Sequence, residues 1–117
     1  AEWILCSAAG ATQPAIVVSG ANAGYAIAPF AGKVTALMYN LTVATTSAAS
    51  AITVADGAGN AIDVVNIPVA LINKGGVLDI DETDADATVA KGEAISVTSD
   101  GGSGAGAAMI WIQIERL

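Results

Sequence analysis

Hydrophobic and polar residues alternate with a period of two along most of this chain. Ile95 and Val97 alternate with Ser96 and Thr98, and isoleucines occupy every second position of residues 110–114. This period is that of a half-buried β-strand, and the four glycines of residues 100–106 indicate a turn between two strands. We therefore expect residues 89–115 to form a closing hairpin. Trp111, Gln113 and Glu115 share the second face of the last strand. Because Trp111 makes this face fairly apolar as well, we expect the strand to lie centrally or its outer face to meet another surface.

The same alternation predicts several other strands, separated by glycine-rich or polar turns. The predicted strands span residues 3–7, 15–19, 25–30, 32–43, 51–55, 62–67 and 77–80. We expect residues 8–11 to end the first strand, and Pro29 to keep its own strand near a sheet edge. Leu37, Tyr39, Leu41 and Val43 are predicted to share one face of the longest strand, and residues 56–60 to form a tight hairpin turn.

About eight short strands with no 3.6-residue period predict an all-β fold. We expect one domain over residues 1–117, a jelly roll or related antiparallel β-sandwich with at most one short helical turn. Apolar residues make up 54% of the chain and aromatic residues only 4%, so the core should consist of Ala, Val, Ile and Leu. The mean hydropathy of +0.63 is high, and charged residues reach only 13%. These values predict that a partner covers part of the surface.

Charge and hydropathy argue against nucleic acids and membranes as partners. The net charge is −7, and the four basic residues, Lys33, Lys74, Lys91 and Arg116, are scattered along the chain. Polar residues and prolines interrupt the uncharged run 7–32, and the run 34–55 alternates like strands, so neither is expected to span a membrane. Residues 1–6 lack the basic and apolar regions of a signal peptide, which predicts a cytosolic product. The single cysteine, Cys6, is expected to be a buried hydrophobe.

The residues of this chain favour no catalytic chemistry. The absence of histidine removes the usual general base, the Ser-His and Cys-His pairs, and most zinc sites. The glycine-rich stretch from Asp100 to Gly106 lacks the Gly-Lys-Ser/Thr ending of a phosphate-binding loop. We predict that the chain is not an enzyme and needs no cofactor.

Five carboxylates in residues 79–86 form the strongest candidate for a metal site. The weak candidate ligands for a hard cation such as calcium are Asp79, Asp81, Asp84 and Asp86. An EF-hand loop beginning at Asp79 would need glycine at its sixth position and glutamate at its twelfth, where the chain has Asp84 and Ala90. The favoured interpretation is a solvated acidic loop that aids solubility or faces a basic partner, with no metal.

The order of strands and turns resembles a known family. Gly32-Lys-Val-Thr-Ala-Leu37 opens a long strand, Ile52-Thr-Val54 follows a Thr/Ser-rich turn, and Asn66-Ile-Pro68 precedes a glycine turn. Residues 88–102 then lead through a Gly/Ala-rich loop into the last strand. Over residues 25–115 this pattern resembles the small jelly-roll decoration, or cement, proteins of tailed-bacteriophage heads, and related head-fibre bases.

The resemblance implies a homotrimer on local three-fold axes of an icosahedral shell, bound to the major capsid protein, with no cofactor and no catalysis. It implies a place on the capsid surface of the virion, and in the host cytoplasm during assembly.

The aromatic residues are the candidates for contacts. We predict Trp3, Tyr25, Phe30 and Trp111 as interface residues, and we expect the strands of Trp3 and Trp111 to be neighbours. Two alternatives stay open. One is a trimeric phage fibre or adhesin. The other is a carbohydrate-binding β-sandwich, for which Trp3, Trp111, Tyr25 and Tyr39 would supply the aromatic platform.

Overall fold

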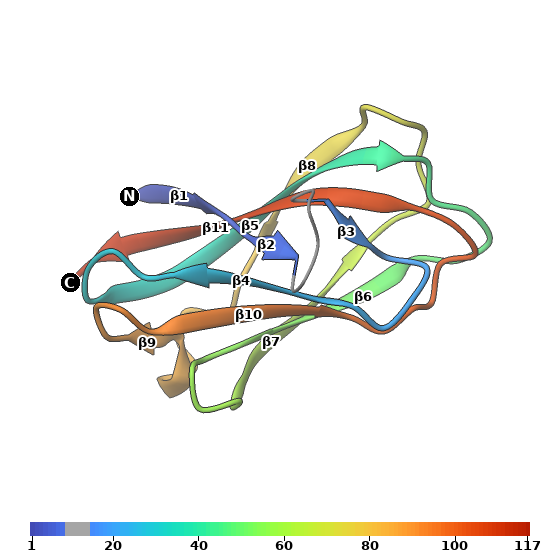
Figure 1. Cartoon of the computed structure of the whole chain (residues 1–117). Helices are drawn as coiled ribbons and strands as arrows, with labels where there is room; N and C mark the ends of the chain where they lie inside the picture. Colours follow the sequence, from blue (N-terminus) through green and yellow to red (C-terminus); the bar gives the residue numbers. More distant parts are fainter. Residues whose placement is uncertain (9–14) are drawn as a thin grey trace.

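Two antiparallel β-sheets pack face to face in this protein (Figure 1). The computed structural model describes residues 1–8 and 15–117. Sheet A has the order β1 (Glu2–Leu5), β11 (Ala107–Arg116), β5 (Gly32–Val43) and β8 (Gly75–Asp79), with β3 (Ile16–Val17) beside β11 and β9 (Thr88–Val89) beside β5. Sheet B has the order β2 (Ser7–Ala8), β4 (Ala23–Ile27), β10 (Ala94–Ser99), β6 (Ser50–Ala55) and β7 (Ala61–Ile67).

The predicted all-β, jelly-roll-like sandwich is confirmed. Within the described residues the helical structure is one 3₁₀ turn, η1 (Ala85–Ala87), as expected. The bounds of β5 coincide with the predicted strand 32–43, and β11 is a central strand between β1 and β5. The Asp56–Asn60 hairpin turn is also present, because β6 and β7 are antiparallel neighbours and the Asp56 N–H donates to the Asn60 carbonyl at 3.0 Å.

The predicted closing hairpin is wrong. β10 pairs with β4 and β6 in sheet B, whereas β11 pairs with β1, β3 and β5 in sheet A. The glycine-rich loop 100–106 therefore crosses from one layer of the sandwich to the other. Alternation shows which side chains of a strand face the core, but two strands that face the same core from opposite sheets alternate in the same way. The pattern could not separate these two arrangements.

The first predicted strand divides into two, because the chain changes sheet at Cys6. β1 lies in sheet A and β2 in sheet B, and the Cys6 N–H between them donates to the Ile110 carbonyl at 2.8 Å. Cys6 is fully buried, as expected, and this burial raises the pKa of its thiol to about 12. Residues 9–11 of the turn that was predicted to end this strand lie outside the described residues.

The strand before Pro29 lies near a sheet edge, as expected. β4 pairs with β10 along its length, and on its other side with the short edge strand β2 at Gly24 and Tyr25. Pro29 lies beyond the end of β4, where its missing N–H removes no ladder hydrogen bond. The proline thus marks the end of a strand and says little about its neighbours.

Two irregularities in the β5–β11 pairing change which side chains of β5 point to the core and which point outward. Gln113 lies opposite Ala36 and Ile114 opposite Val34, so Thr35 is an extra residue. A second shift leaves Thr42 without a direct partner and turns Val43 outward, 50% exposed. The prediction that Val43 shares the face of Leu37 is therefore wrong.

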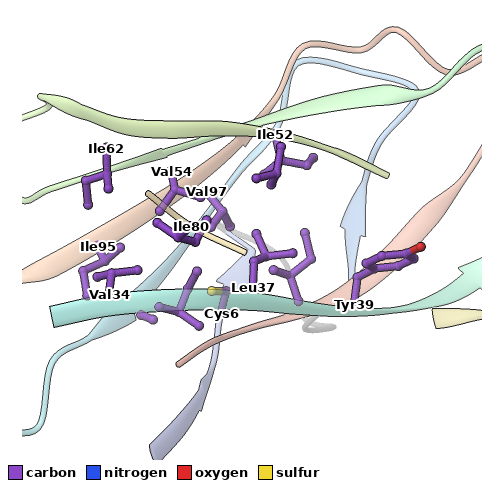
Figure 2. Packing of buried hydrophobic residues seen from close by; sticks show 14 of the residues in the cluster. Cys6, Val34, Leu37, Tyr39, Ile52, Val54, Ile62, Ile80, Ile95 and Val97 are labelled. Atoms are coloured by element: carbon purple, nitrogen blue, oxygen red, sulfur yellow. The ribbon is translucent and has the colours of Figure 1, made fainter. Parts of the chain in front are cut away.

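The core between the sheets is aliphatic, as the composition predicts. Figure 2 shows Val34 and Leu37 of β5 on one side of this core, and Val54, Ile95 and Val97 of sheet B on the other. Tyr39 is the one aromatic ring in the buried cluster of the described residues, and it is 7% exposed. Burial raises the pKa of the Tyr39 hydroxyl.

Candidate interaction surface

A row of apolar side chains crosses the outer face of sheet A. Leu5 of β1 lies opposite Trp111 of β11, Trp111 lies opposite Met38 of β5, and Met38 lies opposite Val77 of β8. Because successive side chains of a strand point to opposite faces, the buried Ile110 and Ile112 place Trp111 between them on the outer face. We call these four residues the sheet A row. All four are partly or well exposed, and Val77 is 59% exposed.

The adjoining positions of the same face are mostly uncharged. Trp3 lies opposite Gln113, which lies opposite Ala36, and the Thr35 hydroxyl donates to Gln113 Oε1 at 3.1 Å. On the other side of the row, Met109 lies opposite Asn40. Charged residues lie further toward the termini, where Asp79 of β8 is opposite Ala36 and Glu115 is opposite Lys33. The outer face of sheet A is therefore apolar at its centre, with neutral polar groups beside the row and charges toward the termini.

The loop between β7 and β8, residues 68–74, continues this apolar surface. Val69, Leu71 and Ile72 are all more than half exposed, and Leu71 reaches 70%. Backbone hydrogen bonds of 2.8 Å from the Asn73 N–H to the Leu41 carbonyl, and from the Leu41 N–H to the Lys74 carbonyl, hold the loop on β5. Asn40 Nδ2, on the outer face, donates to the Asn73 carbonyl at 3.3 Å. These contacts hold the loop against β5 at Asn40 and Leu41, close to Met38 of the sheet A row.

Charge is distributed very unevenly along the sandwich. Both termini, the β6–β7 turn and residues 80–93 lie at one end, on the left in Figure 1, and the loops 44–49, 68–74 and 100–106 lie at the other. We call the first half, which holds both termini, the terminal half. Ten of the eleven acidic residues and three of the four basic residues lie in the terminal half; the exceptions are Asp100 and Lys74. The net charge of −7 therefore belongs to one half, and the other half is neutral.

The four predicted interface residues do not form one surface. Trp3 and Trp111 lie together on sheet A, on neighbouring strands as expected. Tyr25 is 46% exposed on the outer face of sheet B, opposite Ser96 and Ser7. Phe30 lies in the β4–β5 loop, where the Arg116 guanidinium carbon is 4.1 Å from the centre of its ring.

Tyr39 cannot contribute to the aromatic platform that the carbohydrate-binding alternative would use, because its ring is buried in the core.

The acidic candidates 79–86 use their carboxylates mainly for local turns. Asp81 Oδ1 accepts from the N–H and hydroxyl of Thr83, and Asp84 Oδ1 accepts from the Asp86 N–H at 2.9 Å as the N-cap of η1. Asp79 lies apart from them on the outer face of sheet A. Over residues 1–8 and 15–117, no three or more His, Cys, Asp or Glu side chains gather as a metal site would require.

The carboxyl groups of this acidic loop differ in their pKa. Hydrogen bonds from the Thr83 hydroxyl and backbone lower the pKa of Asp81. Desolvation, with repulsion from Asp84 and Asp56 as smaller causes, raises the pKa of Asp86. These are the responses of capping residues and of closely spaced like charges, and they fit an acidic solvated surface.

A polar cluster holds the loop that crosses between the sheets. The buried hydroxyls of Ser50 and Ser99 are 2.9 Å apart, and Ser99 Oγ donates to the Val18 carbonyl at 3.2 Å. Asp100 Oδ1 accepts from the Gly102 N–H at 2.8 Å and the Ala51 N–H at 3.0 Å, and these contacts lower the pKa of Asp100. The carboxylate that begins the glycine-rich stretch therefore fixes a loop.

Sequence reasoning missed Leu5, Met38, Val77 and Leu71 as surface candidates. The chain carries no charge from Val64 to Asn73, which is a visible signal for the β7–β8 loop. Leu5, Met38 and Val77 come next to Trp111 only through strand pairing. No local pattern in the sequence shows which strands pair.

Comparisons with known proteins leave the family open. No family model matches the chain, and no curated protein matches it. Among solved structures, the isomalto-dextranase of Arthrobacter globiformis T6 complexed with panose is similar over 90% of this chain, with 18% identity and a TM-score of 0.46. The chain spans 17% of the length of that enzyme. A likeness of this degree carries no argument about function.

No helix among the residues that the structure describes is long and apolar enough to cross a membrane.

Proposed function

We propose that this chain is a non-catalytic structural protein that binds the outside of a phage head as a homotrimer and stabilises the capsid shell. The observation that supports this most directly is the apolar, nearly uncharged surface formed by the sheet A row and the β7–β8 loop. Continuous apolar surface of this kind on a small acidic protein is typical of a site for protein–protein contact.

Apolar burial supplies the stabilising free energy in this proposal. Each Å² of apolar surface that is removed from water contributes roughly 25 cal/mol, before the costs of association are subtracted. Three copies fixed by symmetry hold several capsid subunits at once, so weak individual contacts add up to durable attachment. The partner is then the major capsid protein.

The acidic terminal half can orient the trimer relative to the shell through electrostatic attraction. A surface with the whole net charge of −7 is attracted to basic patches and repelled by acidic ones. We expect the rate of association with the shell to fall as salt concentration rises, since salt screens such long-range attraction.

The test uses purified shells from which decoration proteins are absent. Shells are incubated with the chain, separated from free protein by sedimentation, and heated or treated with chaotrope beside untreated shells. The proposal predicts saturable binding and a higher disruption temperature. Shells that neither bind the protein nor gain resistance would refute it.

One observation favours a second function, carbohydrate binding. Trp3 and Trp111 lie on one face with the amide side chains of Gln113 and Asn40, and aromatic rings beside amides are a common means of holding sugar rings. Titration calorimetry with soluble glucans and other glycans tests this function. Heat of binding that disappears in Trp111→Ala would favour it over the capsid function.

A further inference from the structure

We propose that the free edge of β8 takes up an extended segment of the shell protein as an added, hydrogen-bonded strand of sheet A. This inference rests on the proposed function and adds to it the way in which the partner is held. Backbone groups at the side of the sheet make this contact, whereas side chains make the apolar contacts of the outer face. Addition of a strand to an open sheet edge is a recurring mode of peptide recognition.

Alternate residues of β8 are hydrogen-bonded to β5. In an antiparallel pair, residues that exchange backbone hydrogen bonds alternate with residues that do not. Just beyond β8, the Ile80 N–H donates to the Thr35 carbonyl at 3.2 Å. Along the register of the two strands, Leu78 and Gly76 are therefore the residues of β8 that bond to β5.

Gly75, Val77 and Asp79 direct their N–H and C=O groups away from β5, toward the side of the sheet. β8 is the last strand on this side of sheet A, and β9 pairs with β5 further along, at Gly32 and Lys33. Within residues 1–8 and 15–117, no hydrogen bond reaches the outward backbone groups of these three residues of β8. All three residues are exposed. Their spacing of two residues matches the hydrogen-bonding groups of a single extended strand.

The edge strand of the other sheet, β7, is protected in ways that β8 is not. Asp63 Oδ1 accepts from the Val64 N–H at 2.8 Å, and Asp63 Oδ2 accepts from the Asp81 N–H at 2.9 Å. The second contact holds the acidic loop beside β7, and η1 packs on the same strand. A charged side chain and a covering segment are common protections of a sheet edge. Residues 75–78 of β8 carry no charge, so this edge lacks such protection.

The side chains at this edge indicate what the added segment should contain. Val77 ends the sheet A row, so the residue beside it on an added strand continues that row and should be apolar. Asp79, the last residue of β8, favours a basic residue beside it. The acidic terminal half attracts the same basic residue over a longer range. The occupant is therefore an extended segment with an apolar residue in its middle and a basic residue at one end.

Charge argues against β1 of a second copy as the occupant. β1 is the other edge strand of sheet A, and Asp79 lies level with Trp3 across the sheet, through Ala36 and Gln113. A ring that joined β8 of one copy to β1 of the next at this level would bring Asp79 close to Glu2, a like charge. Pairing of β8 with β8 of a second copy would give a dimer, which light scattering detects.

The experiment separates the backbone of Val77 from its side chain. Val77→Pro removes the outward N–H and costs no hydrogen bond to β5, whereas Val77→Thr keeps the N–H and makes the side chain polar. The matched control is Val64→Pro, which changes an exposed valine on the edge of β7. Binding to shells without decoration proteins is measured by sedimentation over a range of concentrations, and circular dichroism checks each fold.

We expect Val77→Pro to bind shells more than about tenfold more weakly than the wild type, because it loses a backbone hydrogen bond to the added strand and its ring blocks the approach of that strand. Val77→Thr should lose less affinity than Val77→Pro, and Val64→Pro should bind like the wild type. A loss in Val77→Thr with none in folded Val77→Pro would place the contact on the outer face and overturn the inference.

Hydrogen exchange gives a second test, in case Val77→Pro does not fold. In the free wild-type protein, the amides of Val77 and Asp79 should exchange more than about tenfold faster than those of Gly76 and Leu78, which are bonded to β5. Shell binding should slow exchange over residues 75–79, measured by mass spectrometry. Unchanged exchange over these residues in shell-bound protein would overturn the inference.

The outcomes distinguish this inference from the proposed function. If the wild type binds shells and folded Val77→Pro binds equally well, the inference fails and the proposed function stands. If the wild type does not bind shells, the proposed function fails, and the inference fails with it because its occupant is a shell segment. A dimer of the free protein that Val77→Pro dissociates would make a second copy the occupant and would also overturn the inference.

Discussion

Trp3 and Trp111 are diagonal neighbours on one face of sheet A. Leu5 lies opposite Trp111, and Trp3 lies opposite Gln113, two positions further along β11. Both indoles are partly exposed, although they come from the two ends of the chain. The two tryptophans of this protein therefore report on a single surface.

Tryptophan fluorescence should follow self-association. We expect the emission maximum to move to longer wavelength on dilution, because separation of the copies exposes both indoles to water. Val64→Lys changes an exposed residue of β7, at the edge of sheet B, and should behave like the wild type. Val77→Lys changes a residue of the sheet A row and should show the longer-wavelength emission at all concentrations. Identical spectra for all three proteins at every concentration would contradict association through the sheet A row.

Adjacent residues of β11 should differ sharply in their effect on stability. Ile112 is fully buried, so Ile112→Ala should reduce the free energy of unfolding by about 2–5 kcal/mol through lost burial and a cavity. Trp111→Ala should leave the fold intact and weaken association, because its side chain faces outward. Chemical denaturation measures the first effect and light scattering the second. Equal loss of unfolding free energy in both variants would show that Trp111 is a core residue.

Asp100 should make the crossing loop sensitive to acid. The Gly102 N–H is the main cause that lowers the pKa of Asp100 below its ordinary value of 3.8, so folding favours the ionised carboxylate. Its contribution to stability is complete above that ordinary value and is lost as the pH falls through the lower pKa of the folded state. We expect Asp100→Ala to unfold at a lower temperature than the wild type near neutral pH. This difference in unfolding temperature should narrow below about pH 4.

The control for Asp100 is Glu82→Ala, since the Glu82 carboxylate takes part in no hydrogen bond within the described part of the chain. This variant should show no comparable gap. A gap for Asp100→Ala that widens toward low pH would mean that the carboxylate does not stabilise the loop in its ionised form.

Cys6 should be inert to thiol reagents while the protein is folded. Its side chain is fully buried and its thiol pKa is about 12, so almost no thiolate exists near pH 8. An aromatic disulfide reagent should label the chain only after unfolding in guanidinium chloride. As a control, Ser7→Cys in a Cys6→Ala background places an exposed thiol one residue away, and this thiol should react at once in the folded protein. Rapid labelling of native wild-type protein would contradict the burial of the Cys6 side chain.

The sequence by itself determined which side chains face the core. The isoleucines of β11 and the residues Ile52 and Val54 of β6 are buried as their alternation predicts, because a strand offers only two faces and one is apolar. The turn at 56–60 was equally predictable, since Asp56, Gly59 and Asn60 bend the chain through contacts among themselves. Both features depend on interactions within a few residues.

Only the tertiary structure decided which strands are neighbours. Residues 95–98 and 110–114 have the same pattern, yet they lie in opposite sheets, and the extra residue Thr35 shifts the faces of β5 relative to simple alternation. The sheet A row joins Leu5, Met38, Val77 and Trp111, which are far apart in the sequence. Strand pairing brings them together, and pairing is selected by the packing of the whole core, to which every strand contributes. A surface of this kind therefore leaves no local signal in the sequence.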